Sequence, residues 1–102
     1  MKKIINGKMY NTETAKALGA AYSNAPVNGF EYWEEMLYKK KTGEYFLYGY
    51  GGPMSRYAEY ADINNWSSGD KFTPLTETGA MKWAERYLSA EEYCEIFGEP
   101  EE

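Results

Sequence analysis

The chain has 102 residues and a formal net charge of −5, which suits one domain with one modest core. It contains no histidine and only one cysteine. These counts exclude an internal disulfide, histidine-based acid–base catalysis, nucleophiles activated by histidine, and zinc sites built from histidine and cysteine. We therefore expect a protein that is not an enzyme and that holds no metal or cofactor.

Aromatic residues make up 18% of the sequence, and eleven of them are tyrosines. Because a buried tyrosine hydroxyl needs a hydrogen-bonding partner, such a core is expected to reach the surface. The residues after Met1 do not have the pattern of a signal peptide, so we expect none; no apolar run has membrane-spanning length, and the lone Cys94 suits a reducing compartment. We expect a soluble, cytoplasmic domain over residues 1–98, followed by a frayed acidic tail over residues 99–102.

The N-terminal segment predicts a hairpin and then a helix. Residues 2–10 suit two short strands, because Asn6-Gly7 is a strong signal for a two-residue turn between them. Asn11 or Thr12 can cap a helix over residues 13–22. The expected apolar face of that helix consists of Ala15, Leu18 and Tyr22.

After a loop over residues 23–29, the clearest pattern spans residues 32–50, where two aromatic-rich runs flank Thr42-Gly43. This dipeptide suits a hairpin turn with the glycine in the left-handed conformation. Placing Lys40 opposite Glu44 fixes the register. The expected pairs are Tyr38–Phe46, Met36–Tyr48 and Glu34–Tyr50 on one face, and Leu37–Leu47 and Lys39–Tyr45 on the other. Since both faces carry apolar pairs, either other elements cover both or one is offered to a partner.

The segment after this hairpin predicts mostly irregular structure. Glycines and Pro53 end the hairpin, and residues 54–65 predict a loop with one helical turn marked by Tyr57, Tyr60 and Ile63. Residues 67–70 predict a turn. Residues 71–75 predict a strand, and Pro74 places it at the edge of a sheet or at its own end.

Two helices are predicted at the C-terminus. Thr76 caps the first, which runs to about Leu88, and Ser89 with Glu92 forms a capping box for the second, which stops at Gly98. Their expected apolar faces are Ala80, Trp83, Ala84, Tyr87 and Leu88, and Tyr93, Ile96 and Phe97. The predicted fold class is α+β: a small antiparallel sheet centred on the long hairpin, with the C-terminal helices packed on one face.

Three other features could carry chemistry, and each has a plainer interpretation that we favour. Glu34 and Glu35 are adjacent, so they point to opposite faces of a strand and are interpreted as exposed acids. Residues 49–52 are glycine-rich, but they lack a phosphate-loop ending and are interpreted as a tight backbone. Cys94 lies among apolar neighbours and is interpreted as a small core residue.

The leading functional prediction is a protein-binding module, with a protein partner or a second copy of the chain as the ligand. The candidate partner-binding residues are of types enriched in interface hot spots: Tyr48, Tyr50, Arg56, Tyr57, Tyr60 and Trp66. The alternative that these aromatics cover the core stays open.

Two rival functions remain. Lys39-Lys40-Lys41 with Tyr45 and Tyr48 could bind single-stranded nucleic acid, although the net negative charge opposes it. The glutamate-rich C-terminus could instead inhibit a nucleic-acid enzyme.

Several segments together carry a family resemblance that spans most of the chain. They are residues 4–8, 35–39, 42–47, 51–57, 83–85 and 96–98. With them the chain resembles a family of small hypothetical proteins of gut Firmicutes, often encoded near mobile elements, with no known activity. The resemblance implies a bacterial cytoplasmic setting and favours an accessory or host-defence-modulating role.

Overall fold

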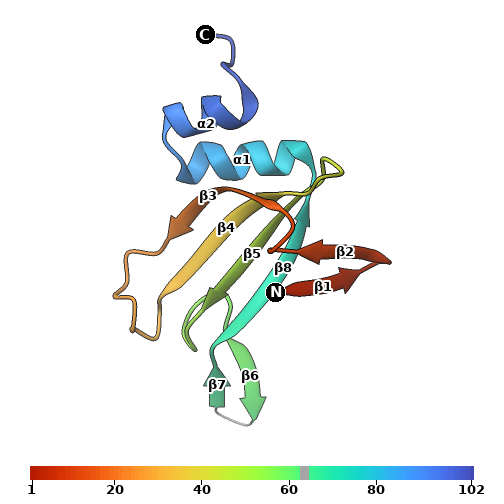
Figure 1. The fold of residues 1–102 in the computed structure, drawn as a ribbon. Helices are drawn as coiled ribbons and strands as arrows, with labels where there is room; N and C mark the ends of the chain where they lie inside the picture. The colour runs from red at the N-terminus through yellow and green to blue at the C-terminus, as the bar shows by residue number, and fades with distance from the viewer. Residues whose placement is uncertain (63–64) are drawn as a thin grey trace.

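The computed structural model describes residues 1–62 and 65–102 and has the α+β fold that the sequence predicts. A four-stranded antiparallel sheet has the order β3-β4-β5-β8, and β1–β2 and β6–β7 form separate hairpins. Both helices lie together on one side of the sheet, and the two hairpins lie at separate places around it (Figure 1). The elements are β1 (Lys2–Ile5), β2 (Lys8–Asn11), β3 (Lys16–Tyr22), β4 (Trp33–Lys39), β5 (Tyr45–Gly51), β6 (Glu59–Asp62), β7 (Asn65–Ser67), β8 (Gly69–Leu75), α1 (Glu77–Tyr87) and α2 (Ala90–Phe97).

The central hairpin, β4–β5, has the predicted register. The backbone amide of Lys40 donates a 2.7 Å hydrogen bond to the carbonyl of Glu44. Gly43 has a φ of +95°, a conformation that glycine adopts without a steric penalty. The observed partners are Trp33–Gly51, Glu34–Tyr50, Glu35–Gly49, Met36–Tyr48, Leu37–Leu47, Tyr38–Phe46 and Lys39–Tyr45.

The N-terminal hairpin is also as predicted, and its turn places Asn6 and Gly7 at positive φ. Tyr10 on β2 packs edge to face against Phe46 on β5, with 5.4 Å between ring centroids. Together with Phe72 these residues form a second core cluster. The hairpin therefore covers part of the sheet face that lies opposite the helices.

The predicted helix over residues 13–22 is wrong, because this segment forms β3 and pairs with β4. Alanine and leucine favour helices, but pairing with a neighbouring strand overrides that local preference. A β-bulge between Ala17 and Gly19 fits the segment onto β4. Gly19 also admits the side chain of Leu88, which would approach to 2.9 Å of a Cβ at this position.

The segment between β5 and β8 differs from the prediction in two places. Turns over residues 53–57 lead into the β6–β7 hairpin, where a loop with one helical turn was expected; Ile63 lies outside the described residues. The predicted turn over residues 67–70 is also wrong, because Ser67 ends β7 and Gly69 begins β8. The strand predicted around Pro74 is confirmed as part of β8, at the edge of the sheet.

Both C-terminal helices begin at the predicted caps. The Thr76 hydroxyl accepts a 3.0 Å hydrogen bond from the Gly79 amide, and Ser89 with Glu92 forms the capping box of α2. Helix α1 buries Ala80, Trp83 and Ala84 against a core from the sheet: Ala21, Leu37, Tyr45 and Leu47. Tyr93 and Phe97 on α2 pack against the same core. The helices therefore cover one face of the sheet, as predicted.

Candidate functional site

The sheet has two faces with different cover, because side chains alternate along each strand. The face under α1, which carries Leu37 and Leu47, is called the helix face. The opposite face is called the open face. Its covered half, Tyr38, Phe46 and Phe72, packs with Tyr10 of β2. Its uncovered half consists of Tyr22, Glu34, Met36, Tyr48, Tyr50 and Asp70.

One row of side chains crosses the uncovered half perpendicular to the strands. The register places Tyr22 opposite Glu34, Glu34 opposite Tyr50, and Tyr50 opposite Asp70. Neighbouring strands lie about 4.8 Å apart, so the two carboxylates are separated by roughly 10 Å across the sheet. Aromatic rings and acids therefore alternate along this row.

Hydrogen bonds hold the rings of the uncovered half. The Tyr32 hydroxyl donates to the Glu34 carboxylate at 2.5 Å, and the Tyr50 hydroxyl donates to its other oxygen. On the next strand pair, the Tyr48 hydroxyl donates to Asp70 at 2.8 Å. These bonds fix the positions of the Tyr32, Tyr48 and Tyr50 rings.

The same environment keeps these hydroxyls protonated. The hydrogen bond to Glu34, followed by burial, raises the pKa of Tyr32 and of Tyr50 to about 12. Burial, followed by the hydrogen bond to Asp70, raises the pKa of Tyr48. Near neutral pH these three hydroxyls therefore stay protonated and uncharged, and they donate hydrogen bonds to Glu34 and Asp70.

A small cavity of about 100 Å³ opens on the uncovered half, and its lining includes Ala20, Tyr22, Glu34, Met36, Tyr48 and Tyr50. Ala20 on β3 is paired with Met36 on β4, and its short side chain leaves room for the cavity between the larger side chains. Tyr22 is 60% exposed and Tyr50 is 42% exposed. The cavity is much smaller than ligand pockets of roughly 300–1,000 Å³, so it suits a single functional group.

The helix face carries a carboxylate of its own, Glu35, which is only 5% exposed. It accepts hydrogen bonds from the Trp83 indole at 2.8 Å and from the Tyr57 hydroxyl at 2.5 Å. The Arg56 guanidinium lies 3.4 Å from it and 4.1 Å from the centroid of the Trp33 ring. The interpretation of Glu35 as an exposed acid is therefore wrong, whereas the prediction that Glu34 and Glu35 point to opposite faces of the strand is confirmed.

Gly49 explains how Tyr57 reaches Glu35. A Cβ at Gly49 would overlap the Tyr57 hydroxyl, so only glycine lets this ring approach β5 so closely. The glycines of residues 49–52 are followed by turns and then β6, so no helix begins there to bind a phosphate. Close packing accounts for these glycines, which agrees with their interpretation as a tight backbone.

The candidate partner-binding residues do not form one patch. Tyr48 and Tyr50 lie on the open face, whereas Arg56 and Tyr57 belong to the Glu35 site on the helix face. A third place is the β6–β7 hairpin, where Tyr60 and Trp66 pack edge to face at 5.5 Å and are 60% and 59% exposed.

The predicted partner-binding residues left out Tyr22, Glu34 and Met36 of the uncovered half, and the buried Tyr32 that donates to Glu34. The predicted register already paired Glu34 with Tyr50 and Met36 with Tyr48, and this was the available signal. Tyr22 could not be found, because its segment was expected to be a helix.

The basic hairpin tip and the two tyrosines proposed to join it do not form one surface, although Lys39 lies 5.4 Å from the centroid of the Tyr45 ring. Lys40 lies 3.2 Å from Glu44 and 4.2 Å from the centroid of the Tyr10 ring. Lys8 approaches the same carboxylate at 2.8 Å. Tyr45 is buried on the helix face, and Tyr48 lies on the open face, so the two rings cannot stack one nucleic-acid strand together.

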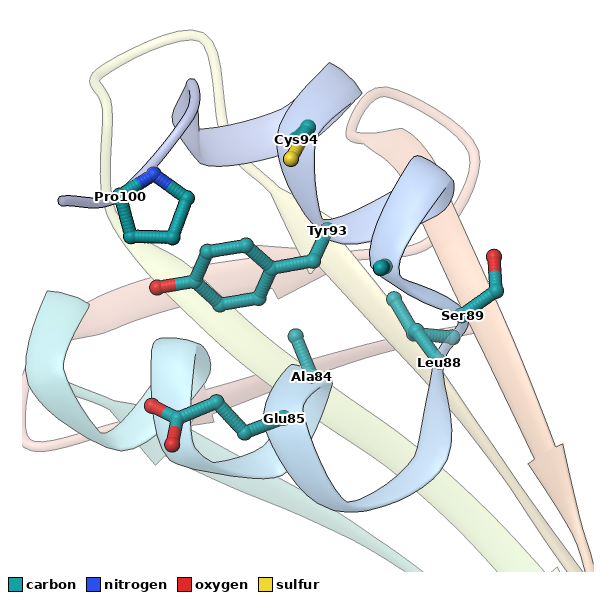
Figure 2. Close-up of a pocket in the computed structure, with 8 residues that line it drawn as sticks. Ala84, Glu85, Leu88, Ser89, Tyr93, Cys94 and Pro100 are labelled. Atoms are coloured by element: carbon teal, nitrogen blue, oxygen red, sulfur yellow. The ribbon is translucent and has the colours of Figure 1, made fainter. Parts of the chain in front are cut away.

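An open cleft of about 550 Å³ lies between α1 and α2, where Tyr93 and Pro100 lie near Ala84 and Glu85 (Figure 2). Cys94 also lines it and is half-buried, so it lies at the margin of the core. Ser89 on the rim already caps α2. The cleft therefore offers mainly apolar surface, with few polar groups to orient a ligand.

No family model matches the sequence, and neither a curated protein nor a solved structure matches it. Over the described residues, no helix is long and apolar enough to cross a membrane. In the same part of the chain, no three acidic or cysteine side chains are grouped to hold a metal ion. The uncovered half of the open face is the candidate site in which exposed rings, carboxylates and a small cavity lie together.

Proposed function

We propose that this domain is a non-catalytic protein-binding module that receives its partner on the uncovered half of the open face. The observation that carries the proposal is the row Tyr22, Glu34, Tyr50 and Asp70, in which exposed rings alternate with carboxylates. Tyrosine is common at binding hot spots because it offers a large contact area and loses little freedom on binding. The bonds from Tyr50 to Glu34 and from Tyr48 to Asp70 reduce that loss further.

Two neighbouring loops extend the surface beyond the sheet. Phe30 is 67% exposed and Met54 is 65% exposed, and the Met54 amide donates a 2.8 Å hydrogen bond to the Phe30 carbonyl. A shallow cleft joins Phe30 to Tyr50. Aromatic and methionine side chains are enriched in protein interfaces, so this extension supports a protein as the ligand.

The charge of the row supports a protein partner over nucleic acid. Glu34 and Asp70 would repel phosphates, and nucleic-acid affinity depends on neutralising phosphates with basic side chains. The resemblance to proteins encoded near mobile elements adds a bacterial, cytoplasmic setting to the proposal.

The test compares two substitutions that add the same charge to different surfaces. Tyr22→Lys changes an exposed position on the open face, and Thr78→Lys changes an exposed position on α1. Tagged protein would be expressed in the bacterial host, with a photo-crosslinking residue in place of Phe30, and its cross-linked products identified by mass spectrometry. We expect one product that survives Thr78→Lys and is lost in Tyr22→Lys. Equal yields in both variants would reject the open face as the binding surface.

Self-association is distinguished by solution mass. If the partner is a second copy of the chain, sedimentation equilibrium of the purified domain shows a dimer that dissociates in Tyr22→Lys and persists in Thr78→Lys. Trp66→Ala serves as a control for the separate β6–β7 surface, and it should leave the interaction unchanged.

A further inference from the structure

Two adjacent glutamates of β4 have related surroundings on opposite faces of the sheet. Each carboxylate accepts a hydrogen bond from two neutral ring donors: Tyr57 and Trp83 for Glu35, and Tyr32 and Tyr50 for Glu34. On the helix face the chain completes this arrangement with a cation. The Arg56 guanidinium lies over the Trp33 ring at 4.1 Å and reaches Glu35 at 3.4 Å.

On the open face the corresponding cation is missing from the described part of the chain. The ion pairs of residues 1–62 and 65–102 involve Glu35 and Glu44, and none involves Glu34. The cavity beside Glu34 is lined by alanine, methionine and tyrosine side chains, and none of its lining residues is basic. Neutral donors satisfy two of the lone pairs of a carboxylate, but they leave its charge and its remaining acceptor sites free.

The cavity has the size of a side-chain head group. Its volume of about 100 Å³ corresponds to roughly three water molecules at about 30 Å³ each. Tyr22 and Tyr50 flank Glu34 on the two neighbouring strands. A planar guanidinium can stack on an aromatic ring and donate to a carboxylate at the same time, as Arg56 does on the other face.

We propose that Glu34, Tyr22 and Tyr50 bind an arginine side chain of the partner protein. The inference rests on the proposed function and specifies its chemistry. The guanidinium donates to the oxygens of Glu34 and packs against an adjacent tyrosine ring. Asp70, about two strand spacings away in the same row, adds a second attraction for a basic segment.

The test uses two short peptides that differ only in charge. The probe is acetyl-Gly-Arg-Gly-amide, and the control replaces arginine with citrulline, which has nearly the same shape and no charge. Each is titrated into the uniformly ¹⁵N-labelled full chain, and amide shifts are followed by NMR. We expect shifts centred on residues 22, 34 and 50, and about tenfold weaker binding of the citrulline peptide, because it lacks the charge-assisted hydrogen bond.

Two variants with the same change in charge complete the test. Glu34→Gln should weaken binding of the arginine peptide about tenfold, whereas Glu59→Gln on β6 should leave it unchanged. A lysine peptide should bind less tightly, because an ammonium lacks the planar fork. The inference is overturned if arginine and citrulline peptides bind equally, if Glu34→Gln has no effect, or if the lysine peptide binds as well as the arginine peptide.

The outcomes separate this inference from the proposed function. If cross-linking depends on Tyr22 but the arginine peptide does not shift residues 22, 34 and 50, the protein-binding surface stands and the arginine subsite falls. If the peptide binds as expected but cross-linking is unaffected by Tyr22→Lys, the subsite stands and its role in partner capture falls.

Discussion

Glu34 and Glu35 are neighbours in the sequence, yet the fold places them in opposite circumstances. Glu35 is 5% exposed and joins the central hairpin to α1 through Trp83 and to the following turn through Tyr57. Glu34 is half-buried and holds two tyrosine hydroxyls on a surface that stays accessible. A carboxylate that is surrounded by its own chain stabilises the fold, whereas one with free acceptor sites at the surface can serve a ligand.

The largest difference between the two sites should appear in stability. Glu35→Ala leaves Trp83 and Tyr57 without their shared acceptor, and we expect the free energy of unfolding to fall by about 2–5 kcal/mol, because each stranded buried donor costs about 1–3 kcal/mol. Glu34→Ala frees the hydroxyls of Tyr32 and Tyr50 and should lower it by only about 1–2 kcal/mol, because Tyr50 is 42% exposed and water can replace its lost acceptor. Urea unfolding followed by circular dichroism measures both values. Similar losses in the two variants would contradict the contrast drawn between the faces.

The Glu35 site should also be sensitive to the backbone beneath it. Gly49→Ala places a methyl group where the Tyr57 hydroxyl lies, and we expect a loss of about 1–3 kcal/mol in the free energy of unfolding. The matched control is the same change in a Tyr57→Ala background, where the clash is removed. The loss should then nearly disappear, and an undiminished loss would show that Tyr57 is not what Gly49 accommodates.

The Glu34 site should show itself in tyrosine titration. Tyr32 and Tyr50 have folded-state pKa values of about 12, above the ordinary value of 10.0. Their contribution to stability is therefore fully present below pH 10 and is lost as the pH rises to about 12. Glu34→Gln should move two tyrosines toward pH 10 in absorbance at 295 nm, while Glu59→Gln should not. An unchanged titration curve would mean that Glu34 does not hold these hydroxyls.

Much of the fold could be predicted, because its strongest determinants are local. Asn6, Gly7 and Gly43 specify their turns by the positive φ they adopt. Thr76 and Ser89 specify helix starts by the hydrogen bonds their hydroxyls accept. Once the turn at Gly43 is placed, the register of β4 on β5 follows residue by residue.

What could not be predicted depends on contacts between distant segments. β3 has a helix-favouring composition, and only its pairing with β4 makes it a strand. The burial of Glu35 depends on Trp83, which lies 48 residues away. The alternation of Glu34 and Glu35 was visible in the sequence, but which of the two faces the helices would cover was not. The candidate site was therefore located only in part, through Tyr48 and Tyr50.

The separation of the two faces has a consequence for how such a domain can diversify. Positions 22, 34, 50 and 70 lie in one row on the accessible side, and their strand neighbours at 21, 35, 49 and 71 point the other way. Under the proposed function, a combinatorial library randomised at the first four positions would vary the contacts offered to a partner while leaving the packed interior intact. Selection could therefore explore new specificities on this scaffold without first searching for compensating mutations.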